Sequence, residues 1–224
     1  LLRRINDLMD SHEARRTIFL LGDYVQRSLD ARDNIFDIVH TGKKLVETGQ
    51  HTYNHVTIAP IATRPDKTPV SPEQLREELT KTNNLFRASL DIQSIGLRAP
   101  LGYARGIPED VAKVVYDCGM AYISSDLRDK NWGINAPLVE EGKPRQPRRY
   151  KCGLIEVPSH GWQDTALTGT SLTQGTADYP ETPEAALDHY RSLLVEAQGL
   201  EAQLGTVYVG LCMHPWAIKE YDPQ

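Results

Sequence analysis

Short apolar runs recur along the chain, and segments with helical spacing separate them. The first clear run covers residues 17–21 and ends at Gly22. An uninterrupted apolar run of this length is typical of a strand that is buried on both faces, as in parallel sheets. Comparable runs predict further strands at residues 95–98, 121–125, 153–157 and 206–213.

The segments between these runs predict helices. Residues 34–47 carry apolar side chains at roughly helical spacing. Another helix should run from Ser71 to about Ser89. Ser is a preferred N-cap, Pro72 suits the first turn, and Gln74 can complete a capping box with Ser71. Three more helices are predicted, over residues 2–11, over residues 108–118 and from Thr182 onward.

This alternation of strands and helices predicts an α/β fold with a parallel sheet. The pattern fits a barrel and a doubly wound sheet equally well. Residues 131–147 are rich in Pro, Gly and charged side chains, so we expect them to form an excursion on the surface.

Composition and charge narrow the possible functions only slightly. Lys and Arg total 25 against 30 Asp and Glu, which gives a formal charge of −5. Nucleic-acid binding relies on basic patches, so this balance argues against such a partner. The sequence has no run of roughly 18 apolar residues that would predict a membrane span. Three widely spaced cysteines form no CxxC pair and favour free buried thiols over one disulfide: Cys118, Cys152 and Cys212.

The sharpest local feature is a pair of histidines four residues apart, His51 and His55. On one helical turn, side chains with this spacing point the same way and can present two imidazole nitrogens to one cation. The pair follows a predicted strand end, where α/β proteins build their sites. Two unrelated surface histidines would have the same spacing, and such a pair is not rare in a chain with seven histidines.

Other polar residues also follow predicted strands. His214 comes after the run at 206–213, where it could serve as a general acid or base or simply cap the strand. Arg98 precedes a Pro/Gly turn whose N–H groups could face an oxyanion, although an ordinary surface loop would look the same. Asp126 and Asp129 follow another strand, and aspartates in loops commonly form turns.

Together these segments resemble the motifs of polysaccharide deacetylases, the NodB homology group of carbohydrate esterase family 4. The resemblance covers about residues 16–216. It rests on four motifs in the family's order: His-Thr-x-x-His at 51–55, Arg-x-Pro-x-Gly at 98–102, Asp-x-x-Asp at 126–129 and Leu-Cys-Met-His at 211–214. It implies a distorted (β/α) barrel with fewer than eight strands, and hydrolysis of N-acetyl groups on an amino-sugar polysaccharide or oligosaccharide.

The resemblance also implies roles for single residues. Those matching His51 and His55 bind a divalent metal, usually zinc, and the one matching His214 protonates the leaving amine. The residue matching Arg98 holds the catalytic base, and Asp129 is a candidate catalytic carboxylate, although Trp132 stands three residues after it rather than next to it. Leu101 occupies the place of a frequent Tyr that binds substrate through its backbone N–H.

A further segment could line the substrate cleft. His160 and Trp162 follow the strand predicted at 153–157, and sugars stack on aromatic rings, so we interpret both as candidate substrate-binding residues. Trp162 could equally be packing at the end of the sheet.

One family motif has no counterpart in the chain. Paired aspartates, which supply the catalytic base and a third metal ligand, should precede the helix at residues 2–11. We therefore expect residues 1–224 to form one deacetylase domain that lacks its first strand and its last helix and strand. A degenerate, inactive homologue is the alternative, and Asp23 is a remote candidate for the third ligand.

Two other functions stay open at this point. One is a cyclic-amide hydrolase of the allantoinase type, which belongs to the same superfamily and would act on a small amide. The other is a non-catalytic carbohydrate-binding homologue, which the missing aspartates favour and the retained histidines oppose. A glycan substrate would suit a secreted or envelope protein, whereas a small amide would suit the cytoplasm.

Overall fold

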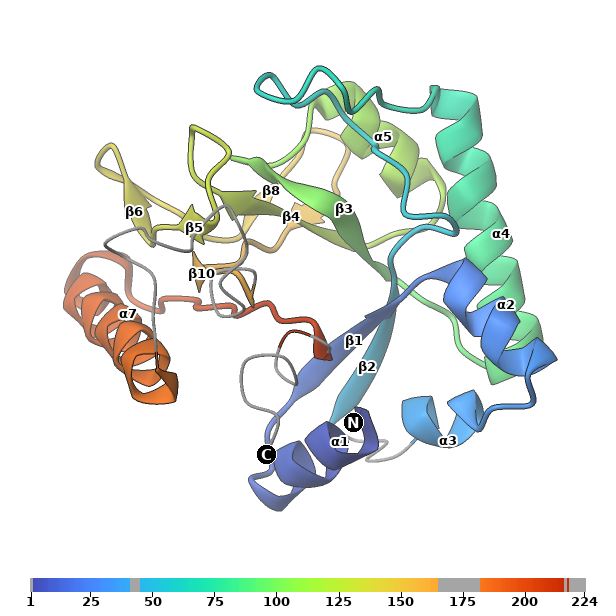
Figure 1. The fold of residues 1–224 in the computed structure, drawn as a ribbon. Helices are drawn as coiled ribbons and strands as arrows, with labels where there is room; N and C mark the ends of the chain where they lie inside the picture. The colour runs from blue at the N-terminus through green and yellow to red at the C-terminus, as the bar shows by residue number, and fades with distance from the viewer. Residues whose placement is uncertain (1, 41–44, 165–181, 216, 218–224) are drawn as a thin grey trace. The chain divides into compact units, whose positions relative to one another are not determined.

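The computed structural model describes residues 2–40, 45–164, 182–215 and 217 (Figure 1). The chain forms two compact units. The first comprises residues 1–101, 107–124 and 149–156, and the second comprises residues 102–106, 125–148 and 157–224. Strands β3 (Gly96–Ala104) and β4 (Tyr122–Arg128) each begin in the first unit and end in the second.

A mostly parallel sheet has the strand order β1-β2-β3-β4-β9-β8. Strand β1 (Arg16–Leu20) pairs in parallel with β2 (Val46–Gln50) along its whole length. Strand β2 pairs in parallel with β3, and β4 with β9 (Ile155–Glu156). The predicted α/β fold is therefore confirmed. Within the described residues the order has two ends, at β1 and at β8 (Arg148–Arg149).

Short antiparallel pairs complete the strands of the second unit. Strand β5 (Asn135–Ala136) pairs with β10 (Gly161–Trp162). Strand β6 (Val139–Glu140) pairs with β7 (Lys143–Pro144). The predicted surface excursion at 131–147 is thus partly wrong.

Ion pairing explains why part of the segment 131–147 is buried. The Arg145 side chain is fully buried, and its guanidinium forms ion pairs with Asp126 and with Glu140, which lies 3.0 Å away. A buried guanidinium is tolerated only when carboxylates compensate its charge. Leu138 is also buried, so a stretch that reads as polar in sequence holds part of the second unit's interior.

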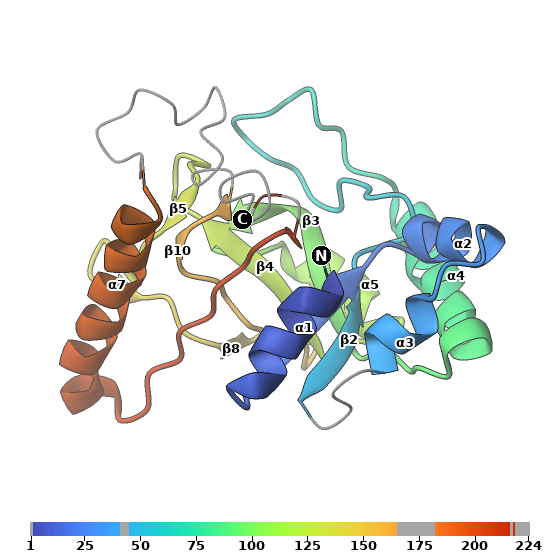
Figure 2. The same cartoon turned by 60° about the horizontal axis from the view of Figure 1, so that its bottom comes forward.

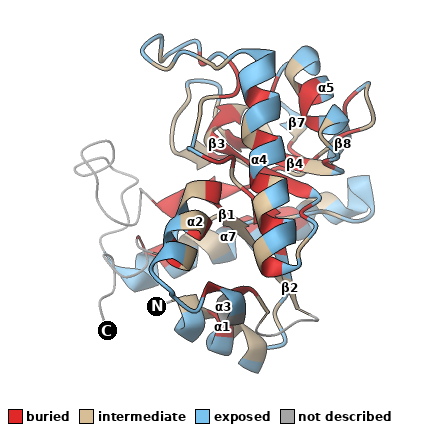
Figure 3. Ribbon diagram, turned by 90° about the vertical axis from the view of Figure 1, so that its right-hand side faces the viewer, coloured by how far each residue is buried: buried red, intermediate tan, exposed pale blue. Residues whose placement is uncertain are grey.

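Most helices lie where the sequence predicts them. The described helices are α1 (Leu2–Ser11), α2 (Gly22–Asp30), α3 (Ile35–His40), α4 (Pro72–Leu90), α5 (Glu109–Asp117) and α7 (Pro183–Leu204). Of these, α2 was not predicted. The predicted capping box opens α4, with the Ser71 hydroxyl accepting from the Gln74 N–H at 3.2 Å. Figure 3 shows exposed and buried stretches alternating along α4, as expected of an amphipathic helix. No helix in the described ranges is long and apolar enough to cross a membrane.

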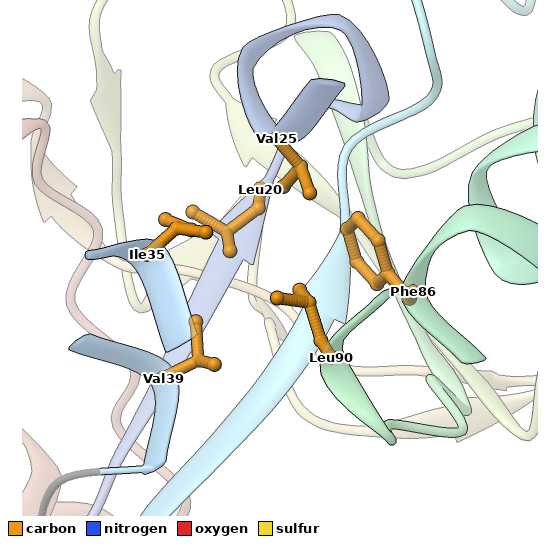
Figure 4. Packing of buried hydrophobic residues seen from close by; sticks show 6 residues of the cluster. All are labelled: Leu20, Val25, Ile35, Val39, Phe86 and Leu90. Carbon is orange, nitrogen blue, oxygen red and sulfur yellow. The ribbon is translucent and has the colours of Figure 1, made fainter. Parts of the chain in front are cut away.

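The core of the first unit joins β1 to three helices (Figure 4). Its fully packed members come from β1, α2, α3 and α4: Leu20, Val25, Ile35, Val39, Phe86 and Leu90. Burying one such side chain is worth about 1.5–3 kcal/mol, so this cluster fixes β1 against α4. Because β2 pairs with β1 along its whole length, the end of β2 is fixed, and so is the starting position of the residues that follow it.

The predicted helix at 34–47 is wrong in its second half. Helix α3 ends at His40, and β2 begins at Val46. The segment Val46–Gln50 has one large apolar residue, so its periodicity gives no strand signal. Pairing with β1 and β3 decides its conformation, because tertiary hydrogen bonds override local propensity.

The predicted strand at 206–213 is also wrong, because the chain there is extended but belongs to no sheet (Figure 2). Val207 and Val209 pack against the cluster of Leu138, Leu193 and Ala197. Its backbone is bonded outside any sheet: the Tyr208 N–H donates to Gln146 Oε1 at 2.8 Å, and the Gly210 carbonyl accepts the His160 N–H at 2.7 Å. Val207 and Val209 therefore pack beside α7 rather than in a sheet.

The cysteines are free thiols, as favoured from their spacing. All three are half-buried rather than fully enclosed: Cys118, Cys152 and Cys212. Burial raises the pKa of the Cys118 thiol, which keeps this side chain in its unreactive protonated form.

Candidate active site

The segment from His51 to His55 is a loop, so the predicted helical turn is wrong. Thr52 and His55 both have left-handed backbone conformations, with φ of 63° and 59°. These two residues bend the chain tightly, and the imidazole rings still meet. Their centroids lie 4.8 Å apart with planes at 74°. The two rings are therefore neighbours, as expected, through a backbone that the sequence did not reveal.

A backbone carbonyl fixes the tautomer of His51. Its Nδ1 lies 2.7 Å from the carbonyl oxygen of Arg98. Because a carbonyl oxygen can only accept, Nδ1 carries the hydrogen, and in the neutral ring Nε2 holds the lone pair. Histidines that bind metals are commonly oriented in this way, with one ring nitrogen donating to a carbonyl or carboxylate.

Arg98 lies on β3 and is only 7% exposed. Its Nη1 donates to the Ser124 hydroxyl at 2.5 Å. Arg98 therefore makes two contacts: its carbonyl oxygen binds His51, and its guanidinium binds Ser124 on the neighbouring strand β4. Three residues on, Leu101 has a φ of 68°, which non-glycine residues seldom adopt. This unusual φ falls within β3.

The donor set of the histidine pair fits part of a zinc site. Catalytic zinc usually takes three protein ligands, and imidazole nitrogen is among its preferred donors. No group of three or more His, Cys, Asp and Glu side chains suited to a metal ion lies within the described ranges. Asp23, the remote candidate, is 43% exposed and pairs with Arg27 at 2.9 Å. The described residues therefore offer at most two of the ligands that such a site needs.

In the second unit, His214 is bound to a buried carboxylate. The His214 side chain is 50% exposed, whereas that of Asp164 is 4% exposed. Both Nδ1 and the backbone N–H of His214 contact Asp164 Oδ2. A carboxylate at Nδ1 holds the ring in one orientation. The partnership spans 50 residues, so no local spacing could have revealed it.

Asp129 stabilises its own loop. Its Oδ1 accepts the N–H groups of Asn131 and Gly133, each at 2.8 Å. This is the turn-forming arrangement that aspartates commonly adopt. Trp132 donates its indole N–H to the Gly102 carbonyl at 3.0 Å and lies under the Arg128 guanidinium. A catalytic role for Asp129 stays a prediction.

His160 is almost fully buried, at 2% exposed, and both of its ring nitrogens bind backbone groups. Nε2 donates to the Arg145 carbonyl at 2.6 Å, and Nδ1 accepts the Gly210 N–H at 3.1 Å. Burial lowers the pKa of His160, which favours the neutral ring that this pair of bonds requires. The geometry gives His160 a structural role, and its binding of substrate stays a prediction.

Trp162 is half-buried, and one face of its ring is covered. His189 on α7 stacks on it with centroids 3.8 Å apart and planes at 6°. The His189 Nε2 also accepts the Trp162 N–H at 3.0 Å. Tyr190 donates its hydroxyl to the Trp162 carbonyl, and burial raises the pKa of that hydroxyl to about 12. Packing thus accounts for one ring face, and sugar stacking stays a prediction.

Comparison with known families identifies the chain. The polysaccharide deacetylase family matches residues 1–123, which is more than half of the 224 residues. The chain belongs to the polysaccharide deacetylase family. The matched range includes His51, His55 and Arg98 and ends before Asp129 and His214. No curated protein matches the chain.

The fold is shared with one solved structure, and others align over part of the chain. A candidate polysaccharide deacetylase from Mycobacterium smegmatis aligns over 98% of this chain and 68% of its own, with a TM-score of 0.65 and 20% identity. A family 4 carbohydrate esterase pseudoenzyme from Bacillus anthracis is 24% identical over 55% of this chain and 37% of its own, with a TM-score of 0.43. A family 4 carbohydrate esterase from Streptomyces lividans, in complex with acetate, is 16% identical over 54% and 53%, with a TM-score of 0.39.

Proposed function

We propose that this chain is a metal-dependent hydrolase that removes N-acetyl groups from an amino-sugar polysaccharide or oligosaccharide. Membership of the polysaccharide deacetylase family supports the reaction class. One observation carries the metal dependence: the rings of His51 and His55 lie 4.8 Å apart, and the Arg98 carbonyl holds Nδ1 of His51. Two imidazoles so arranged suit a divalent cation, and zinc fits nitrogen donors well.

Each side chain of the histidine pair has a defined part in this proposal. His51 and His55 would hold the cation through ring nitrogens, with further ligands and the catalytic base coming from outside the described residues. Such a cation polarises the acetyl carbonyl and lowers the pKa of a bound water. The backbone N–H of Leu101 is our candidate donor to the developing oxyanion, the role that the family resemblance implies for this position.

His214 is our candidate for the acid. Cleavage of the amide C–N bond leaves an amine that must gain a proton. Because Asp164 holds Nδ1 of His214, the opposite nitrogen Nε2 is the one that can deliver the proton. Asp164 would orient the ring, as carboxylates do in other acid–base pairs.

The metal proposal is tested by zinc titration of this chain, and by acetate release from acetylated chito-oligosaccharides in a protein that also carries the paired aspartates. His51→Ala and His55→Ala should each lose zinc binding and acetate release together. His12→Ala, at an exposed histidine after α1, is the matched control and should change neither. Zinc affinity that is equal in His51→Ala and in the unchanged chain would contradict the proposal.

The acid proposal has a separate readout. His214→Ala should lower kcat by about 10²- to 10⁴-fold, the usual contribution of general acid catalysis. Asp164→Asn should lower kcat in the same direction, and zinc affinity should stay unchanged in both variants. Asp188→Asn, an exposed carboxylate on α7, serves as control. Full activity of His214→Ala would reduce this histidine to a surface residue bound to Asp164.

A second candidate function is non-catalytic carbohydrate binding. The described residues hold only two members of a metal site, and this observation favours it. The two functions make opposite predictions for the histidine pair. A binding protein would retain chito-oligosaccharide affinity in His51→Ala and release no acetate with any metal, whereas a deacetylase would release acetate only with the pair intact.

A further inference from the structure

Glu78 on α4 contacts the loop that joins the two histidines. Its Oε2 accepts the backbone N–H groups of Tyr53 at 2.9 Å and Asn54 at 2.8 Å. Its Oε1 accepts from the Asn54 side-chain amide at 2.7 Å. One half-buried carboxylate therefore bonds two of the three residues that separate His51 from His55.

The carbonyl side of the same loop is held by another helix. The first N–H groups of α2, from Gly22 and Asp23, donate to the carbonyls of Thr52 and Tyr53, each at 3.0 Å. The loop is thus clamped between α2, which supplies donors, and Glu78, which supplies acceptors. Charge-assisted bonds from N–H groups to a carboxylate are stronger than neutral ones, so Glu78 is the stronger side of this clamp.

The loop needs such support because its backbone is unusual. Thr52 and His55 both have φ near +60°, a region that residues with a Cβ seldom occupy unless the surroundings impose it. If these two residues relax toward ordinary backbone angles, the imidazole rings turn away from each other. The carboxylate of Glu78 binds the segment between them, so it acts on both rings at once.

We propose that Glu78 is a positioning residue that sets the geometry of the His51–His55 pair through the loop backbone. This inference rests on the proposed function, in which the pair binds a divalent cation. Glu78 differs from a metal ligand in that both of its oxygens accept hydrogen bonds from the loop. No three-ligand metal group that includes Glu78 is found in the described part of the chain.

Glutamine separates positioning from direct ligation. In Glu78→Gln, the remaining oxygen can accept the two backbone N–H groups, and the new amide can face Asn54 after a flip of the Asn54 side chain. Positioning therefore predicts that glutamine largely preserves the site. Leucine at the same place offers no acceptor, so Glu78→Leu should release the loop.

The experiment measures two properties of the whole chain. Zinc affinity is measured by competition with a chromophoric chelator, and the metal-free protein is examined by NMR for a nuclear Overhauser contact between the His51 and His55 rings. Glu77→Leu is the matched control, because Glu77 is an exposed carboxylate one position earlier on α4. Thermal unfolding of each variant identifies loss of fold. If Glu78→Leu does not fold, Glu78→Asp takes its place in the experiment, because aspartate draws the carboxylate back by one methylene.

We expect Glu78→Leu to lose about 10- to 100-fold in zinc affinity, the usual effect of removing a group that orients a metal ligand. The ring contact should disappear in this variant, while Glu78→Gln and Glu77→Leu should keep both properties close to those of the unchanged chain. Glu78→Asp should show a smaller loss in the same direction.

Other outcomes divide cleanly between the two proposals. A ring contact that persists in Glu78→Leu, or a glutamine variant as damaged as the leucine variant, would overturn the positioning role. Zinc affinity that does not depend on His51 would overturn the proposed metal function. The ring contact in the metal-free protein would then still decide whether Glu78 positions the pair.

Discussion

At the residue scale, three histidines differ in what their ring nitrogens face. His51 gives Nδ1–H to a carbonyl, which leaves the Nε2 lone pair for a cation. His214 has a carboxylate at Nδ1, which fixes the orientation of its ring. His160 has one ring nitrogen donating to a carbonyl and the other accepting an amide N–H, so these two bonds require a neutral ring. Their sequence neighbours indicate none of these differences.

The buried His160 should make folding sensitive to acid. Burial places its pKa in the folded protein below the ordinary value of 6.5. As pH falls below about 6.5, His160 becomes protonated in the unfolded chain but stays neutral in the folded chain. The free energy of unfolding therefore decreases until the pH reaches the pKa of His160 in the folded protein. The residue should contribute a slope of up to about 1.4 kcal/mol per pH unit to the free energy of unfolding.

Urea unfolding at about pH 7.5 and about pH 5.5 measures this slope. His160→Gln, which cannot titrate, should show a shallower dependence on pH. His12→Gln, at an exposed position, should keep the slope of the unchanged chain. Equal slopes in all three proteins would mean that other groups cause the acid sensitivity.

At the element scale, α2 begins unusually close to its neighbours. A Cβ on Gly22 would collide with the Tyr53 ring and approach the Thr82 hydroxyl to 2.9 Å. The absence of a side chain therefore lets the start of α2 reach the loop carbonyls that it binds. The Lys81 ammonium lies 3.4 Å from the centroid of the Tyr53 ring, so the ring has little room to move aside.

Gly22→Ala should destabilise the protein by about 1–3 kcal/mol, the usual cost of overpacking, although alanine is the better helix former. Gly199→Ala is the matched control inside α7, where an added Cβ would meet nothing within 4 Å. That variant should gain about 0.5–1 kcal/mol, because alanine loses less entropy in a helix. Chemical denaturation of both variants gives the comparison, and a stable Gly22→Ala would disprove the collision.

The sequence predicts elements well where local signals and tertiary packing agree. Helix α4 has its cap, its Pro and its apolar stripe in one place, and it forms as expected. Local signals do not predict strand β2, because its residues become a strand only through pairing on both sides. The run at 206–213 is apolar but forms no strand: Val207 and Val209 pack against the cluster on α7, whereas Leu211 and Met213 are exposed.

The candidate site divides in a similar way. The histidine spacing identifies His51 and His55, but it predicts a helical turn where two left-handed residues make a loop. The partners of the site, Glu78 and Asp164, are 24 and 50 residues from the groups they bind. Contacts over such separations depend on how elements pack, and no motif of a few residues contains that information.

At the scale of the whole molecule, metal binding and folding are coupled by mass action. A cation that binds only the folded form stabilises it by about 2.7 kcal/mol at a free concentration 100 times Kd. Both candidate ligands lie in the first unit. They follow β2, which pairs along its length with β1 in that unit's core. Metal binding should therefore stabilise the first unit directly.

Hydrogen exchange can locate this stabilisation. Zinc should slow amide exchange in β1 and β2, with a smaller effect on α7 in the second unit. His51→Ala should remove the protection by zinc, and His12→Ala should retain it. Uniform protection across both units, or protection that survives His51→Ala, would place the zinc elsewhere.

The carbonyl of Arg98 affects how the site can evolve. Every amino acid carries a backbone carbonyl, so the group that orients His51 survives any codon change at position 98 as long as β3 keeps its place. The acceptor at position 78 belongs to a side chain, and a single nucleotide change can delete it. One support of the histidine pair is thus inherited with the fold, and the other must be maintained by selection on a single codon.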